Sequence, residues 1–192
     1  MKCSEICALI EQEYGTEYAC DWDNVGLLAG RSTKEVKKIL LSLDATDEVV
    51  RMAVEGGYDM LITHHPMLFS AIKRVTDQDM NGRRLLELIR NDISYYAMHT
   101  NYDTRGMADL AARLMGLTEC AVLEEVKDGE GIGRVGKLPH PMTLRECGEQ
   151  VKVAYGIPNV RLFGDPDTQV SLVGICPGAG KSTMPLALGF GC

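Results

Sequence analysis

The stretch KILLSLDATDEVVRMAVEGGYDMLITHHP, residues 38–66, decides the fold of this 192-residue chain. It contains two short apolar runs, at 38–45 and 60–63, that fit buried strands. Between them, Thr46 can cap a helix whose first turn carries two acidic residues and which a pair of glycines ends. A strand, a helix and a second strand in this order are typical of a parallel sheet in which the helix covers one face.

The same alternation continues along the chain. Residues 81–91 have the apolar spacing of a helix, 94–99 form a third apolar run, and 106–116 fit another helix. An amphipathic helix at 4–14 precedes the first strand. We therefore predict an N-terminal α/β lobe, residues 1–125, with a mostly parallel sheet and crossover helices.

A polar, glycine-rich stretch, EVKDGEGIG at 125–133, marks the expected boundary between two lobes. Beyond it we expect a strand, a helix opened by a threonine cap and two further strands, at 132–138, 143–155, 159–163 and 169–176. These elements predict a smaller, incomplete α/β second lobe at 130–192.

Composition excludes several classes of protein. The net charge of −7 and the sequence pI of about 5.1 repel phosphate backbones, so we expect no nucleic-acid partner. Seven scattered cysteines suggest reduced thiols rather than a disulfide framework. The N-terminus does not resemble a signal peptide, and no window approaches the roughly 20 apolar residues that cross a bilayer. We expect a cytoplasmic protein without a membrane partner.

Two adjacent histidines, His64 and His65, follow the apolar run at 60–63. Neighbouring side chains in an extended backbone point to opposite sides, so these imidazoles favour two ions side by side over chelation of one. Asp103, which follows the next apolar run, is a candidate carboxylate to bridge the ions. Imidazole and carboxylate ligands suit zinc, iron, manganese or nickel. We therefore predict two divalent metal ions bound by His64, His65 and Asp103.

The alternative interpretation is structural: His64 and His65 cap the strand by hydrogen bonding, and Asp103 caps the following helix. The metal site is favoured because three of the four histidines, at positions 64, 65 and 99, fall within 40 residues at successive strand ends. His99 could ligate, hold a substrate or shuttle protons. We favour a place beside the ligands or facing the substrate, and take His99 as the candidate catalytic residue.

Four motifs together resemble the Nif-three-like family, whose members are called GTP cyclohydrolase I type-two homologues: DNVGLLAG (23–30), ITHHPMLF (62–69), AMHTNYD (97–103) and GMADLAARLMGL (106–117). The resemblance covers essentially all of 1–192. It implies that His64, His65 and Asp103 are ligands of a dinuclear metal centre, and that members form ring-like homo-oligomers. The family draws a further histidine and glutamate from a C-terminal segment, which we expect this chain to lack.

These observations predict a metal-dependent hydrolase scaffold that acts on a nucleotide-like or other small heterocyclic substrate and associates into a homo-oligomer. GTP cyclohydrolase activity is implied by the resemblance alone. The alternative is a non-catalytic metal-binding or regulatory interaction protein, and metal-dependent loss of a substrate would separate the two.

Overall fold

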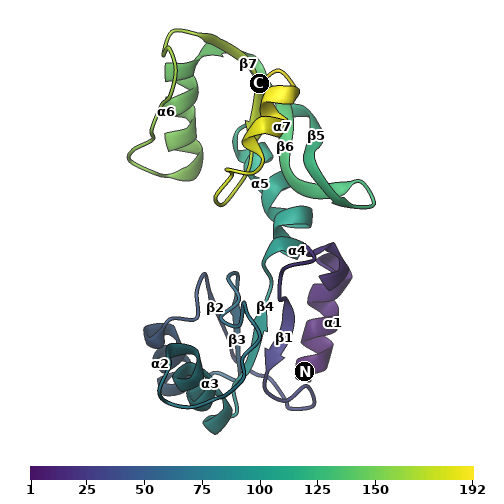
Figure 1. The fold of residues 1–192 in the computed structure, drawn as a ribbon, viewed down its shortest axis with the longest axis vertical. Coiled ribbons are helices and arrows are strands. Elements are labelled where there is room, and N and C mark those ends of the chain that lie inside the picture. Colours follow the sequence, from purple (N-terminus) through teal and green to yellow (C-terminus); the bar gives the residue numbers. More distant parts are fainter. The chain divides into compact units, whose positions relative to one another are not determined.

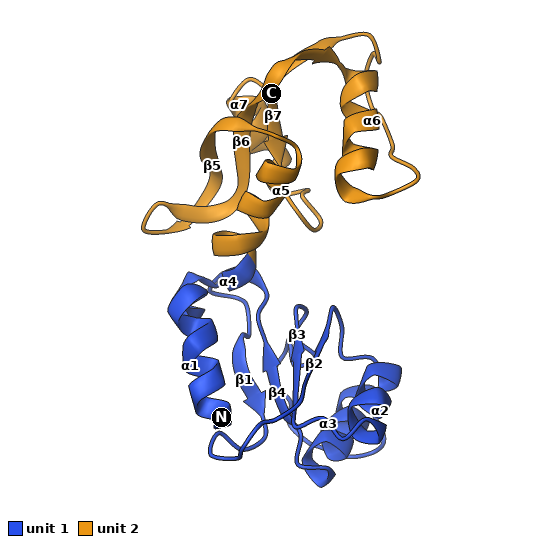
Figure 2. Ribbon diagram, turned by 180° about the vertical axis from the view of Figure 1, so that it is seen from behind, with its two compact units in different colours: residues 1–102 blue, residues 103–192 orange.

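The computed structural model describes residues 1–192 and divides into two compact units, unit 1 (Met1–Tyr102) and unit 2 (Asp103–Cys192) (Figure 2). Unit 1 contains a four-stranded sheet and unit 2 a three-stranded sheet, each accompanied by helices. The predicted α/β class is confirmed.

The sheet of unit 1 is mostly parallel, with the strand order β1-β4-β3-β2. Its strands are β1 (Gly26–Ala29), β2 (Ile39–Ser42), β3 (Met60–Thr63) and β4 (Ser94–Ala97). Strands β2, β3 and β4 run parallel, while β1 pairs antiparallel with β4. The crossover helices α2 (Asp47–Glu55) and α3 (Met80–Arg90) connect the parallel strands as predicted.

Helices cover both faces of this sheet (Figure 1). Because side chains alternate along a strand, Leu61 and Tyr95 pack on one face in a cluster with residues of α2 and α3. Met60 and Ile62 pack on the other face against the cysteines of α1 (Cys3–Glu13). The two central strands, β3 and β4, are buried on both faces, whereas the edge strand β2 alternates between exposed and partly buried residues.

Strand β1 was not predicted, because its sequence GLLA lies in a stretch rich in turn residues. Gly30 follows it with a φ of +100°. A Cβ added there would lie 2.6 Å from the Cα of Ser94, so the backbones of β1 and β4 approach as closely as they do only because this residue is glycine.

After β4 the chain forms three short elements: α4 (Thr100–Tyr102), a π-helix η2 (Asp103–Met107) and α5 (Ala108–Leu114). The helix predicted at 106–116 corresponds to α5 and the end of η2. A separate 3-10 turn, η1 (Thr16–Tyr18), follows α1.

Unit 2 is built on the antiparallel sheet β5-β6-β7. Its remaining elements are β5 (Thr118–Lys127), β6 (Glu130–Thr143), α6 (Leu144–Tyr155), β7 (Gln169–Ile175) and α7 (Met184–Gly189). Thr143 caps α6 in a capping box with Glu146, as its sequence predicts. The core between α6 and the sheet includes Met115, Leu138 and Met142.

Two details of unit 2 differ from the sequence prediction. The polar stretch at 125–133 forms the turn of the β5–β6 hairpin, and the two units divide between Tyr102 and Asp103 instead. Glycine and polar residues are equally suited to a linker and to a tight hairpin turn, which is why the sequence did not distinguish them. The strand expected near 159–163 is wrong, because these residues form no regular element.

None of the helices in the structure has the length and apolar character required to cross a membrane.

Candidate metal centre

The register of two parallel strands brings the site residues together. Thr63, the last residue of β3, pairs with Ala97, the last residue of β4. The chain segments that leave these strands therefore start side by side at the carboxyl edge of the sheet, where open α/β sheets bind their ligands. His64 and His65 follow β3 directly, and His99 comes two residues after β4.

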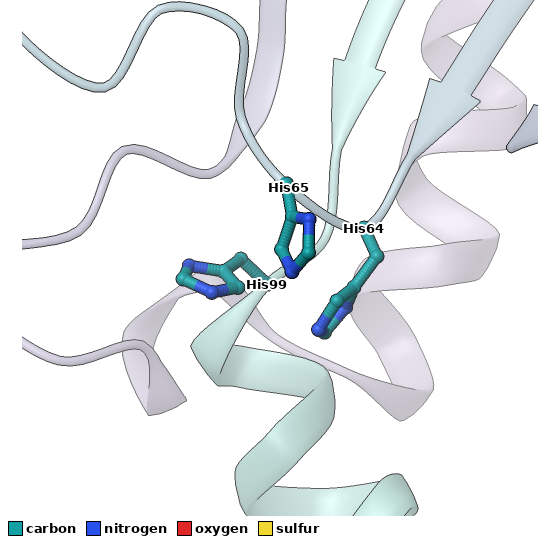
Figure 3. Close-up of side chains that lie close together, drawn as sticks. All are labelled: His64, His65 and His99. Carbon is teal, nitrogen blue, oxygen red and sulfur yellow. The ribbon is translucent and has the colours of Figure 1, made fainter. Parts of the chain in front are cut away.

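Three imidazole rings converge at this edge (Figure 3). One ring nitrogen from each of His64, His65 and His99 lies within 4.8 Å of the other two. The ring centroid of His64 lies 5.0 Å from that of His65 and 5.1 Å from that of His99. We call these residues the three-histidine group. Their spacing allows the three nitrogens to serve a shared metal site.

A bend after β3 explains why the adjacent histidines face the same centre instead of opposite sides. The Thr63 hydroxyl donates to the carbonyl oxygen of His65 over 2.8 Å, which pulls the chain out of the extended geometry assumed from the sequence. The hydroxyl of the fully buried Tyr95 lies 2.8 Å from that of Thr63 and accepts from the backbone N–H of Met67 over 2.7 Å. The buried hydroxyls of Thr63 and Tyr95 thus fix the bend of the backbone at His64 and His65.

Each imidazole is held through its Nδ1 atom. The Nδ1 of His64 lies 3.0 Å from the carbonyl oxygen of Met98. The corresponding atom of His65 lies 2.8 Å from Oδ1 of Asp44, and that of His99 lies 3.0 Å from Oδ1 of Asp23. Because each of these partners is an oxygen acceptor, the tautomer of the neutral imidazole that fits it carries the hydrogen on Nδ1 and the lone pair on Nε2. Metal-binding histidines are oriented in this way, so the donor set fits a divalent ion.

Asp23 is the most deeply placed carboxylate of the site, with a side chain that is 0% exposed. Burial acts to raise the pKa of Asp23, but hydrogen bonds from His99, Thr100 and the backbone N–H of Asn24 outweigh it and lower the pKa to about 2. The hydroxyl of Thr100 donates to this carboxylate over 2.6 Å, and the backbone N–H of Thr100 donates to it over 3.0 Å. Asp23 is therefore ionised at neutral pH, which orients the His99 ring and raises its basicity.

The site is open to solvent on the side of His65. The side chains of His65 and Asp44 are 47% and 53% exposed, whereas that of His99 is 18% exposed. A cavity of about 340 Å³ adjoins His65, and its lining includes Asn81 and Arg84 of α3. A small molecule thus has direct access to one edge of the three-histidine group.

The predicted site residues are only partly accounted for by this group. His64 and His65 belong to it, and His99, predicted as a neighbour of the ligands, contributes a third imidazole on equal terms. Asp103 is the first residue of unit 2 and opens η2, and it is not a member of the group. Its role as a bridging ligand stays a prediction.

The sequence analysis missed the two carboxylates that hold the histidines. Asp44 lies two residues past the end of β2, at the same sheet edge as His65, so the strand-end rule would have identified it. Asp23 gave no such signal, because it belongs to a turn-rich stretch 76 residues away from His99 in the chain.

Comparisons with known proteins agree on one family. All residues from 1 to 192 match the family model described as Duf34/NIF3 (NGG1p interacting factor 3). A Clostridium perfringens protein named GTP cyclohydrolase 1 type 2 homolog is 35% identical over 185 residues, which are 94% of this chain and 71% of that protein. A Streptococcus pneumoniae protein of the same name is 32% identical over 197 residues, covering 100% of this chain and 74% of that one.

Solved structures give the same result for the fold. A Staphylococcus aureus protein matches with a TM-score of 0.87 at 28% identity, covering 100% of this chain and 77% of its own. A Bacillus cereus protein related to NIF3 matches with a TM-score of 0.92 at 22% identity, covering 100% and 80%. The resemblance noted in the sequence motifs is thereby confirmed: the chain belongs to the Duf34/NIF3 family.

Proposed function

We propose that this protein binds a pair of divalent metal ions at the three-histidine group, with Asp103 as a bridging ligand, and hydrolyses a nucleotide-like or other small heterocyclic substrate. Zinc, iron, manganese and nickel all suit imidazole and carboxylate ligands. The name shared by the relatives, GTP cyclohydrolase 1 type 2 homolog, supports a nucleotide-like substrate.

One observation carries the proposal: three imidazoles converge while each is anchored through Nδ1 to an oxygen acceptor. A purely structural histidine needs a hydrogen-bond partner, but nothing requires three such rings to gather at one sheet edge. Nitrogen lone pairs that point toward one centre repel each other. A cation bound between them would remove that repulsion.

The residues of the chain would divide the work between them. Bound divalent ions activate water and polarise the bond under attack. His64 and His65 hold the ions from the end of β3, while the ionised Asp23 keeps the Nε2 atom of His99 basic enough for a ligand or for proton transfer. Asn81 and Arg84, which line the cavity beside His65, are placed to contact a polar substrate.

Metal analysis and calorimetry of protein purified without an affinity tag test the proposal. We expect bound zinc, iron, manganese or nickel, and a titration with Zn²⁺ should show at least tenfold weaker binding for His64→Ala and for His99→Ala, since ligand count sets affinity. The matched control is His140→Ala, because His140 is the one histidine outside the group.

In the titration, unchanged Zn²⁺ affinity in both His64→Ala and His99→Ala would refute the metal site. Incubation of the metal-loaded protein with GTP and other nucleotides then tests for hydrolysis. Tight metal binding with no turnover of any nucleotide would instead favour the non-catalytic metal-binding protein considered as the alternative.

A further inference from the structure

We infer that Trp22 and Phe69 form a stacking surface for a planar heteroaromatic ring, which places the base of the substrate beside the three-histidine group. The inference deepens the proposed function and rests on it for the identity of the neighbouring site. It assigns a binding role to two residues that carry no metal ligand and names the part of the substrate they recognise.

The two rings are large, apolar and exposed. Trp22 is 59% exposed and Phe69 is 52% exposed, although aromatic side chains of this size are normally among the best buried. Their ring centroids lie 5.8 Å apart with an interplanar angle of 48°. Single exposed apolar residues are common on protein surfaces, but two adjoining aromatic rings form a continuous patch with ring area to contact a ligand.

The patch adjoins the candidate metal centre. The ring of Trp22 is 6.1 Å from that of His99 in an edge-to-face arrangement. A ring stacked on Trp22 therefore lies near His99, so that one molecule can reach both the aromatic surface and the three-histidine group. The edge contact with His99 leaves over half of the Trp22 side chain accessible.

Three consecutive residues tie this surface to the site. Trp22 provides one ring, and the carboxylate of Asp23 holds the imidazole of His99. The side-chain amide of Asn24 donates to the carbonyl oxygen of Leu68, the residue before Phe69. Hydrogen bonds made by the two residues after Trp22 thus fix the backbone beside both rings, and one of these residues also orients His99. Such preorganisation reduces the entropy lost on binding.

The chemistry of the patch indicates a planar heterocycle. Stacking of bases on aromatic side chains contributes substantially to binding and tolerates different bases, because every base has a π-face. The patch carries no charge of its own, so it complements the flat, uncharged face of a ring, while the metal ions attract the polar or anionic part of the same molecule.

The single tryptophan of the chain makes this surface directly observable, because all indole fluorescence comes from Trp22. We would titrate zinc-loaded protein with guanosine monophosphate, cytidine monophosphate and ribose 5-phosphate, exciting at the red edge of the indole absorption band. The first two probes carry rings of different size on the same sugar phosphate, and the third carries no ring. We expect quenching and a spectral shift with at least one of the ring-bearing probes and no change with ribose 5-phosphate.

Calorimetry of variants isolates the stacking contribution. Trp22→Ala should bind the quenching probe about tenfold more weakly, the size of effect expected for loss of one stacked base. Trp22→Phe, which keeps an aromatic face, should recover most of the affinity. Phe69→Ala should weaken binding in the same direction as Trp22→Ala, whereas Phe163→Ala, a substitution of an aromatic residue 85% exposed in unit 2, should have no effect.

Several outcomes would overturn the inference: silence with both ring-bearing probes, equal response to ribose 5-phosphate, or equal weakening in Trp22→Phe and Trp22→Ala. Loss of self-association in Trp22→Ala with unchanged probe binding would also overturn it and assign the patch to contact with a second copy. A parallel Zn²⁺ titration of Trp22→Ala should match the unsubstituted protein. If zinc binds neither protein while the nucleotide still quenches Trp22, the metal centre fails and the stacking surface stands.

Discussion

At the residue scale, the candidate site depends on carboxylates that are not themselves in the three-histidine group. Asp23 is ionised, buried and bonded to His99, so it acts on a bound ion through the orientation and basicity of that imidazole. Asp44 holds His65 in the same way but is half exposed, and water competes for its hydrogen bond. The two carboxylates should therefore differ in importance.

We expect Asp23→Asn to weaken Zn²⁺ binding by about 10- to 100-fold, the usual effect of removing a carboxylate behind a metal-bound histidine. Asp44→Asn should weaken it less. Isothermal titration with Zn²⁺ measures both, and Asp21→Asn, in the same turn but exposed, is the matched control. Equal affinities for Asp23→Asn and the control would show that His99 does not depend on Asp23 for its position.

The histidines themselves were predictable because each follows an apolar strand, and parallel strands end at one edge. What the sequence could not supply was the bend that turns His64 and His65 toward one centre. That bend arises from the hydroxyls of Thr63 and Tyr95, which come from different strands and meet only in the folded sheet.

At the element scale, local chemistry determined the helices well. Thr46 accepts a hydrogen bond from the backbone N–H of Val49 at the start of α2, as its position before two acidic residues predicts. Strands were less predictable from the sequence. Strand β1 lies in a stretch rich in turn residues, which masked it in the sequence. Residues 159–163 contain apolar side chains typical of a strand, but they pair with no other strand in the structure.

The cap of α2 gives a direct test of this local stability. We expect Thr46→Ala to lower the free energy of unfolding by about 1 kcal/mol, because a backbone N–H of the first turn loses its acceptor. Urea denaturation monitored by circular dichroism measures the change. Thr33→Ala, at an exposed position outside any helix, should change it by less than about 0.5 kcal/mol.

A group of ion pairs around Lys34 should make the stability of unit 1 sensitive to acid. The side chain of Lys34 is 7% exposed, and its ammonium nitrogen lies 3.8 Å from a carboxylate oxygen of Asp59 and 3.7 Å from one of Asp92. The backbone N–H of Lys37 is the largest influence lowering the pKa of Asp59, and the Arg31 guanidinium is the largest influence lowering that of Asp92. Both carboxylates therefore favour the folded state only while they are ionised.

Because both pKa values are lower in the folded state, their stabilisation is complete above the unfolded pKa, about 3.9, and is lost as the pH falls through the folded values. We expect the urea midpoint to fall between about pH 5 and pH 3. In Asp59→Asn/Asp92→Asn the midpoint should be lower at pH 7 and should change less over this acid range. A double variant with the same pH dependence as the unsubstituted protein would contradict this assignment.

At the scale of the whole molecule, the division into two units was expected but its position was not. It falls between α4 and η2, within a nearly continuous helical run from Thr100 to Leu114. No change in composition marks that point, whereas the glycine-rich turn of the β5–β6 hairpin has the composition of a linker. A boundary defined by long-range contacts therefore left no local signal in the sequence.

Unit 2 exposes large apolar side chains, and we propose on this ground that the protein self-associates, as expected from the sequence. Val153 on α6 is 84% exposed, and Leu188 on α7 is 66% exposed. We expect light scattering to report a homo-oligomer and Val153→Lys to shift it toward smaller species, because a charge is costly in an apolar interface. The control is Gln78→Lys, at an exposed position in unit 1. A monodisperse monomer would refute self-association.

The pairing of Thr63 with Ala97 has a consequence for how this site tolerates change. The distance between His64 and His99 depends on which residues of β3 and β4 lie side by side, and hardly at all on the length of chain that joins them. The segment from Ser70 to Val75, which forms neither helix nor strand and precedes the residues that pack against and cap α3, is therefore a replaceable spacer. Because the closure cost of a loop grows only slowly with its length, residues can be inserted there at little cost. A single residue inserted within β3 would instead reverse the facing of every side chain beyond it and separate the histidines.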